Sequence, residues 1–514
     1  MRRHRLAHLL LPPLAALSVA TLSACGGSST ADSASADEQN APPVADMPSE
    51  EPAQESSPEP APPPEQKPVV VAEPSSTAEP LLSASCAWLF SADPGLVNVF
   101  FPDKDAQYWT ALLPAIPGAE YIVEGRYPDA RYFSYNSYDA LFRPQSVITD
   151  FQIDPLVPGQ NPFVSSNATP GGDYRLTIRL EDKPEQPEPN TLYAGGFPPD
   201  PQDGLPSAVV PVLYRTYVAE GDDTGKVGLP QISLAAPGAE EPPIGFSRCQ
   251  LLNTPVVDQI NDLITDLPNP LPVPGINLIP FSEPEPRFRK FYGLPNLLAT
   301  LIEIGLPVDL PLSENVQSDE GAFLSNINNA YVFSQYSRDK GNSYILRAKA
   351  PRHQPSEGGD PAQVRYWSLC TNNFVTTRYV ACLRDEEIPL DEDGFFTLVV
   401  SDSNNRPDNV TDENHIAWLP WGAIYVDSVL IYRHMLPDPD FAQSVQAIEF
   451  GQDERQSMGE FFPETVYCDR DIIEAAGSRA SDVFDACVNA ADGRAVGGLL
   501  DPLLGPLQDA FSFD

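Results

Sequence analysis

One segment of this sequence occurs twice in similar form. Residues 105–126 align without a gap with residues 328–349, so that Tyr108 falls on Tyr331. Two later segments repeat in the same order along the chain, Arg131–Ser134 as Arg365–Ser368 and Leu213–Arg215 as Ile431–Arg433. Such self-similarity predicts that one structural unit was duplicated. It constrains the architecture far more than the activity, because a fold carries no chemistry until a site is found.

The N-terminus has the pattern of an export signal. Arginines precede the apolar stretch Leu9–Leu22, and small residues lead to Cys25. The run Leu22-Ser23-Ala24-Cys25 resembles the lipobox of bacterial lipoproteins, which implies that residues 1–24 are removed and that Cys25 carries acyl chains such as palmitate. The alternative is an ordinary signal peptide in which the cysteine is incidental. The lipobox predicts a lipid-anchored protein of the cell envelope, and Gly26 favours the outer membrane if the source is Gram-negative.

Residues 25–83 consist mainly of Pro, Glu, Ala and Ser. Such a segment buries too little apolar surface to offset its ordering entropy, so we predict a disordered tether. The formal net charge of the whole chain is −41. Nucleic acid is therefore not expected as a partner, since binding it requires clustered basic residues. The acidic balance favours solubility over an acidic functional surface.

Six cysteines remain besides Cys25, and an even number in an exported chain predicts disulfides. From their placement along the chain, the expected pairs are Cys86 with Cys249, Cys370 with Cys382, and Cys468 with Cys487. The alternative, metal binding, would require a Cys-x-x-Cys motif or a neighbouring Cys/His cluster, and the sequence contains neither. No metal site is therefore predicted from the cysteines.

Short runs of branched and aromatic residues, separated by Pro, Gly, Asn and Asp, dominate both copies. They predict a mainly β chain with two tandem antiparallel jelly-roll or β-sandwich domains, residues 84–250 and 311–460. Apolar residues recur at helical spacing in 256–267 and 294–305, within a helical and Pro-rich connector, 251–310. A helical C-terminal extension is expected over 461–514.

Several segments of the second copy resemble the C-terminal module of bacterial exported proteins that consist of two jelly-roll domains of unknown function. These segments are Arg347–Pro351, Arg365–Asn373, Asp391–Val400, His415–Gly422 and Val429–Pro437. The similarity extends to the first copy through Gly125–Asp139. It implies a jelly-roll fold and supplies no catalytic residues.

Strand alternation places two arginines of each copy on the same face as apolar residues. They are Arg131 and Arg215 in the first copy, and Arg365 and Arg433 in the second. An unpaired buried charge is costly, so something negative is expected to meet them. One possibility is a buried pair with an acid such as Asp139, Asp150 or Asp427. The other is an anionic ligand, such as a carboxylate, in the barrel mouth, with His415, His434 or Trp421 at its rim.

Other motifs carry weaker chemistry. The turns Asp391–Gly394 and Asp402–Glu413 offer carboxylates for calcium, but without the full EF-hand ligand set they are also typical of exposed acidic turns. Trp418 and Trp421 fit either a glycan-binding platform or a strand-end core. No cofactor is predicted apart from this option of calcium.

We therefore expect a membrane-anchored exported lipoprotein that acts as a binding or scaffold protein for a small anionic or glycan-like ligand. The alternative is an exported hydrolase of an ester or polymer that uses His415 or His434, although the sequence identifies no partner serine. A scaffold without a ligand is the third interpretation, suggested by the long tether.

Overall fold

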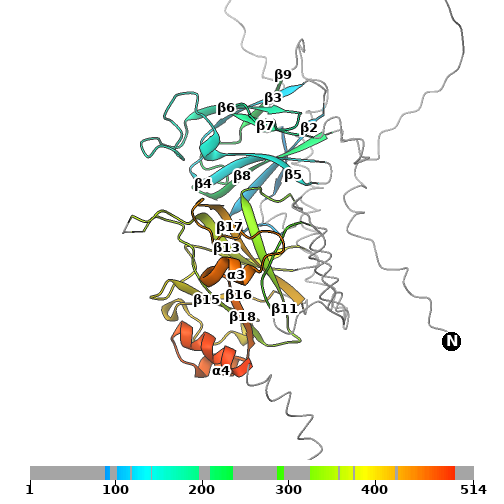
Figure 1. Ribbon diagram of the computed structural model, residues 1–514. Coiled ribbons are helices and arrows are strands. Elements are labelled where there is room, and N and C mark those ends of the chain that lie inside the picture. Colours follow the sequence, from blue (N-terminus) through cyan, green and yellow to red (C-terminus); the bar gives the residue numbers. More distant parts are fainter. Residues whose placement is uncertain are drawn as a thin grey trace, which may run out of the picture. The chain divides into compact units, whose positions relative to one another are not determined.

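The computed structural model describes ten stretches of the chain (Figure 1). They are residues 87–92, 101–115, 119–139, 142–195, 209–235, 286–293, 324–356, 359–373, 377–422 and 427–491. The predicted signal peptide, tether and connector helices lie outside them, as do Cys86 and Cys249. In the stretches that are described, no helix has both the length and the apolar character needed to cross a membrane.

The first half of the described chain forms two sheets. The larger has the order β1-β2-β8-β4-β5 and the smaller β7-β6-β3-β9. In sequence order the strands are β1 (Trp88–Ala92), β2 (Ala106–Pro114), β3 (Glu120–Arg126), β4 (Ala130–Tyr138), β5 (Pro144–Thr149), β6 (Asp173–Arg179), β7 (Thr191–Tyr193), β8 (Val209–Ala219) and β9 (Gln231–Ala235). Neighbouring strands are antiparallel except β6 and β7, which are parallel.

The second half has the same arrangement, with the orders β10-β11-β17-β13-β14 and β16-β15-β12-β18. Its strands are β10 (Arg289–Lys290), β11 (Asn329–Ser337), β12 (Ser343–Lys349), β13 (Val364–Asn372), β14 (Tyr379–Arg384), β15 (Phe395–Ser401), β16 (Ile416–Pro420), β17 (Asp427–Pro437) and β18 (Glu464–Cys468). Here the parallel pair is β15 and β16, which take the places of β6 and β7. The predicted mainly β character is confirmed, with several mostly antiparallel sheets.

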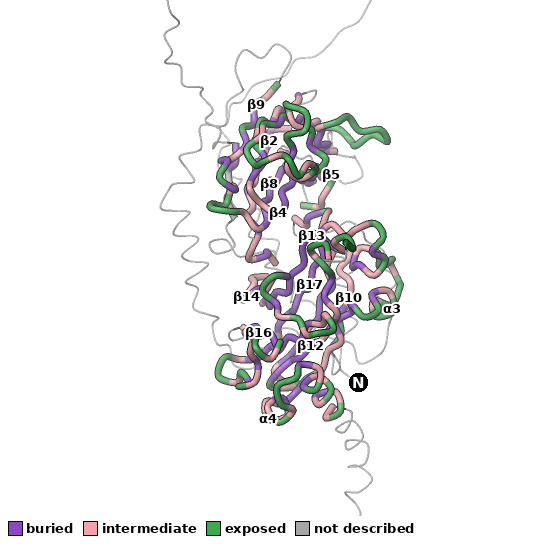
Figure 2. The backbone as a smooth tube through the Cα atoms, turned by 90° about the vertical axis from the view of Figure 1, so that its left-hand side faces the viewer, coloured by how far each residue is buried: buried purple, intermediate pink, exposed green. Residues whose placement is uncertain are grey.

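Each half buries one main core between its two sheets. Tyr121 and Val123 on β3 are buried, whereas Ile122 between them and Glu120 and Glu124 on either side are less buried, as expected for a strand with one face on the core. The first core joins residues of β3 and β6 to residues of β2, β4 and β8, and the second core is built in the same way. Figure 2 shows buried residues along the strands and exposed residues in the loops. Each half is therefore a two-layer sandwich.

Two predictions about the regions flanking the second sandwich need correction. Residues 461–514 were expected to be helical, but β18 lies there and pairs with β12. Strand β18 (Glu464–Cys468) completes the smaller sheet, and helix α4 (Arg470–Ala475) and a helical stretch, 480–491, follow it. Within the predicted connector, Arg289–Lys290 form β10, which pairs with the edge of β11.

Two of the three predicted disulfides are confirmed, and the third lies outside the described residues. Cys370 and Cys382 face each other across β13 and β14. Cys468 at the end of β18 is bonded to Cys487 in the last helical stretch.

Candidate functional site at the contact between the two halves

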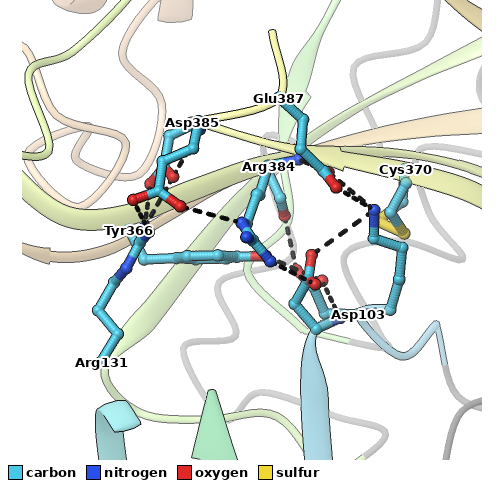
Figure 3. A network of polar contacts seen from close by, with 12 residues as sticks. Asp103, Arg131, Tyr366, Cys370, Arg384, Asp385 and Glu387 are labelled. Atoms are coloured by element: carbon cyan, nitrogen blue, oxygen red, sulfur yellow. Dashed lines mark hydrogen bonds and ion pairs between the residues drawn. A yellow bond between two sulfur atoms is a disulfide. The ribbon is translucent and has the colours of Figure 1, made fainter. Parts of the chain in front are cut away.

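Two of the predicted arginines exchange ion pairs between the halves. Arg131 on β4 reaches Asp385, which follows β14, with 2.7 Å between Nη1 and Oδ1. Arg365 on β13 reaches Asp150, which follows β5, with 2.6 Å between the same atoms. Figure 3 shows Arg131 directed at Asp385. Since β4 and β13 occupy the same place in their sheets, each half gives the other an arginine and receives one.

Both aspartates are fixed by backbone hydrogen bonds as well. Asp150 accepts the N–H groups of Phe133 and Phe151 at 3.1 and 2.6 Å, and begins the 3-10 helix η2 (Asp150–Gln152). Asp385 accepts the N–H groups of Trp367 and Glu386 at 3.2 and 2.9 Å. Burial raises the pKa of Asp150, although Arg365 and the two N–H groups oppose the rise. These charge-assisted hydrogen bonds from the backbone fix the orientation of both carboxylates that the arginines contact.

A third arginine, Arg433 on β17, forms the most deeply buried pair. Its Nη1 lies 2.6 Å from Asp103 Oδ2, and both side chains are almost fully buried. The Tyr366 hydroxyl donates a hydrogen bond of 2.9 Å to the Asp103 carboxylate (Figure 3). The Ser368 hydroxyl donates a second one, of 2.6 Å. Burial alone would raise the pKa of Asp103, but Arg433, Ser368 and the Asp105 N–H together hold that pKa below its ordinary value.

The pair lies beside the disulfide of β13 and β14. Arg433 Nη1 donates to Cys370 Sγ at 3.0 Å. Asp103, Cys370 and Cys382 bring three potential metal-ligand atoms within 4.8 Å of one another. The two sulfurs are bonded to each other, whereas a metal ligand would be a thiolate. This cluster therefore does not fit a metal ion while the disulfide is intact.

The fourth arginine, Arg215 on β8, is surrounded differently. Its side chain is buried, and Nη2 donates to the backbone carbonyl of Leu324. The rings of Tyr108 and Tyr138 lie 5.6 and 5.5 Å from the guanidinium carbon. Among the described residues, its Nε and Nη1 have no hydrogen-bond partner and no carboxylate pairs with its guanidinium. Three of the four predicted arginines thus meet protein carboxylates, and Arg215 does not.

The three residues expected at the rim of an anion site lie elsewhere. Trp421 is fully buried in the second core, with its ring 4.7 Å from that of Tyr336. His434 is also fully buried, its Nδ1 accepts the Val445 N–H at 3.3 Å, and burial lowers its pKa to about 3. His415 occupies an exposed turn with φ of 55°. The ligand-binding role assigned to these residues stays a prediction.

Among the candidate acids, the sequence identified Asp150 and missed Asp103 and Asp385. Asp139 instead pairs with Arg143 four residues away. Strand alternation indicates which way an arginine points, but the aspartate that receives it comes from the other copy, which alternation does not reveal. Asp150 and Asp385 each directly follow the strand that pairs with the arginine-bearing strand, β5 beside β4 and β14 beside β13. This shared position is the sequence signal that could have identified Asp385.

In the turns considered for calcium, arginines meet several carboxylates. Asp391 pairs with Arg347 and accepts the Phe395 N–H at 2.9 Å, which closes the turn before β15. Asp402, which follows the other end of β15, pairs with Arg338, with 2.6 Å between Oδ1 and Nη2. The geometry gives these acids a role in the turns, and calcium binding stays a prediction.

No protein-family model matches this chain, and no curated protein does. A crystal structure of an uncharacterised protein from Burkholderia cenocepacia is similar with a TM-score of 0.41 and 13% identity, covering 76% of this chain and 83% of that one. A protein from Vibrio parahaemolyticus is similar with a TM-score of 0.33 and 14% identity, covering 72% of this chain and 90% of that one. Likenesses at this level carry no functional argument.

Proposed function

We propose that this chain is a lipid-anchored scaffold protein of the bacterial cell envelope, built from a duplicated jelly-roll unit. The observation that carries the proposal is the exchange of ion pairs between the halves, Arg131 with Asp385 and Arg365 with Asp150. These arginines join two sandwiches into one body. Two sandwiches that are joined rigidly and held on a tether can present surfaces of fixed geometry to partner molecules.

Local details that recur in both halves support the duplication. The Asp105 N–H donates to Asp103 Oδ1 at 3.1 Å, and the Asn328 N–H donates to Asn326 Oδ1 at the same distance. Phe101 and Val218 of the first half have a positive φ, and so do Leu324 and Leu436 at the matching places of the second half. Positive φ is uncommon away from glycine, so its recurrence at matching places favours a common origin.

An apolar contact accompanies the ion pairs. Ala106, Tyr132 and Tyr217 of the first half share a buried cluster with Tyr366 and Met435 of the second. The rings of Tyr217 and Tyr366 meet edge to face at 5.4 Å. An apolar contact reinforced by buried charge pairs opposes relative motion of two domains. We therefore expect the halves to behave as one rigid unit.

Export to the envelope rests on the sequence and is consistent with the cysteines. The lipobox at Cys25 supplies the anchor, and the two disulfides of the second half suit an oxidising compartment. Membrane fractionation of Cys25→Ser tests the anchor. The variant should move to the soluble fraction with the thermal unfolding temperature of its body unchanged, and retention on the membrane after a high-salt wash would contradict the proposal.

The hydrolase alternative is tested separately. A fluorophosphonate probe, which labels activated serines, should leave the wild-type chain unlabelled if the chain is a scaffold. Labelling that is lost in His415→Ala or His434→Gln would replace the scaffold proposal with a hydrolase.

A further inference from the structure

Asp103 and Asn326 occupy corresponding places in the two halves. The Tyr366 hydroxyl donates to Asp103 Oδ1 at 2.9 Å, and the Tyr132 hydroxyl donates to Asn326 Oδ1 at 3.2 Å. Two residues before each of them, a backbone carbonyl accepts a hydrogen bond from a buried arginine. Phe101 accepts from Arg433 on β17, and Leu324 accepts from Arg215 on β8. The halves thus differ at this place by a single carboxylate, which is present as Asp103 and replaced by the amide of Asn326.

The buried arginines of the two places also correspond. Arg433 lies across from Tyr331 and Ser368 on its neighbouring strands. Arg215 lies across from Tyr108 and Ser134 in the same way. Asp103 neutralises the charge of Arg433. At the corresponding place near Arg215 the residue is Asn326, whose amide is uncharged. Arg215 is therefore a buried cation without a counter-charge in the described chain, which is a costly arrangement.

A second aspartate of the first half, Asp105, also corresponds to an asparagine, Asn328. Asp105 pairs with Arg384 at 2.9 Å beside the Arg433 site. At the corresponding place Asn328 donates to the Thr149 hydroxyl at 2.5 Å. Asn328 and Thr149 are both uncharged, so no net charge stands at that place. At Arg215 the base is present and the amide of Asn326 occupies the place of the acid, so among the described residues the charge of Arg215 is unbalanced.

The neighbouring tyrosines do not supply the missing charge. Burial is the main influence on Tyr108 and Tyr138, and it raises the pKa of both hydroxyls above the ordinary value. Both are therefore neutral at physiological pH. Their rings cover the guanidinium, and Arg215 is only 1% exposed, so whatever binds there is small.

We propose that Arg215 binds a small monovalent anion of the size of chloride, which takes the electrostatic role of Asp103 in the other half. Nε and Nη1, which have no hydrogen-bond partner among the described residues, are the donors for this ion. The ion is a structural ligand of the contact between the halves, and this inference does not depend on the scaffold function. The binding is a charge-assisted hydrogen bond in a site of low dielectric, where such bonds are strong.

The first test needs no variant. Thermal unfolding of the full-length chain in detergent is followed in sodium chloride and in sodium gluconate of equal ionic strength, since gluconate is too large for the site. At about ten times its dissociation constant, the ion should raise the folded-to-unfolded ratio about elevenfold. Unfolding temperatures that coincide in the two salts would overturn the proposal.

Asn326→Asp is the matched variant, because it restores the acid that the other half has. It should be at least as stable as the wild type in gluconate and should lose the chloride dependence. Asp103→Asn should strengthen that dependence by creating a second uncompensated arginine at Arg433. A chloride effect of equal size in Asn326→Asp would refute the site.

Crystals of the full-length chain grown in sodium bromide give a direct observation that does not rely on a variant folding. An anomalous peak is expected within hydrogen-bond distance of Arg215 Nε or Nη1. Its absence there would overturn the proposal.

Discussion

Replacing Arg433 by Met should destabilise the protein far more than replacing an exposed arginine. Methionine is close in volume and apolar, so the packing is kept while Asp103 loses its partner. Both members of the pair are almost fully buried, and removing one partner of such a pair typically costs about 3–5 kcal/mol of unfolding free energy. Ser368 and Tyr366 still donate to the stranded carboxylate, which places the expected loss at the lower end, about 3 kcal/mol.

The loss should depend on pH in a defined direction. In the wild type the pKa of Asp103 lies below its ordinary value, so its stabilising contribution is present above the unfolded-state pKa and is lost as the pH falls through the folded pKa. Without Arg433, burial dominates and raises this pKa. The stranded carboxyl then destabilises the fold as the pH rises above about 4, so the difference from the wild type is larger at about pH 7 than at about pH 4.

Urea unfolding followed by tryptophan fluorescence at both pH values measures this difference. Arg175→Met is the matched control, because Arg175 and Glu124 form a pair at 2.6 Å with both side chains more than half exposed. Its cost should stay below about 1 kcal/mol. Adding Asp103→Asn to Arg433→Met should recover part of the loss. Equal losses for the two arginine variants, or a loss that is the same at both pH values, would refute the reasoning.

Three further outcomes are expected. Cys468→Ser opens a disulfide with a sequence separation of 19 and should lower the unfolding free energy by about 3 kcal/mol, whereas an unchanged urea midpoint would show that the cross-link adds nothing. Trp421→Ala should cost about 3–5 kcal/mol because the ring is fully buried in the core; a near-neutral effect in thermal unfolding would instead point to a surface platform. His434, with its pKa lowered to about 3, should show ring NMR shifts that do not change between about pH 5 and pH 8, and a titration in that range would contradict its burial.

The features that the sequence predicted well are those set by local pattern. Short runs of branched and aromatic residues indicated strands where the structure has β3, β6 and β15, and Pro, Gly, Asn and Asp separated them. The strand β18 was missed because its five residues, Glu464–Cys468, lie beside a helical pattern and follow Pro463. Such a short run becomes a strand because β12 offers it an edge, which is tertiary information.

The candidate site was predicted in part for a similar reason. Alternation placed the arginines on the same face as apolar residues and called for a negative partner, which Arg131, Arg365 and Arg433 have among the described residues and Arg215 does not. The identity of that partner depends on how two copies meet, since Asp385 is 254 residues away from Arg131 in the chain. The gapless repeat carried one further clue: extended backward by two residues, it aligns Asp103 with Asn326, the place where the charge balance of the two halves differs.

The central claim is that ion pairs exchanged between the halves hold them together. A double-mutant cycle of Arg365→Met and Asp150→Asn in the full-length chain, measured by urea unfolding, tests it most directly. The account predicts a coupling energy of about 1–3 kcal/mol, because the guanidinium contacts both carboxylate oxygens, at 2.6 and 2.8 Å, and Asp150 is fully buried. Losses that simply add, with a coupling below about 0.5 kcal/mol, would contradict it.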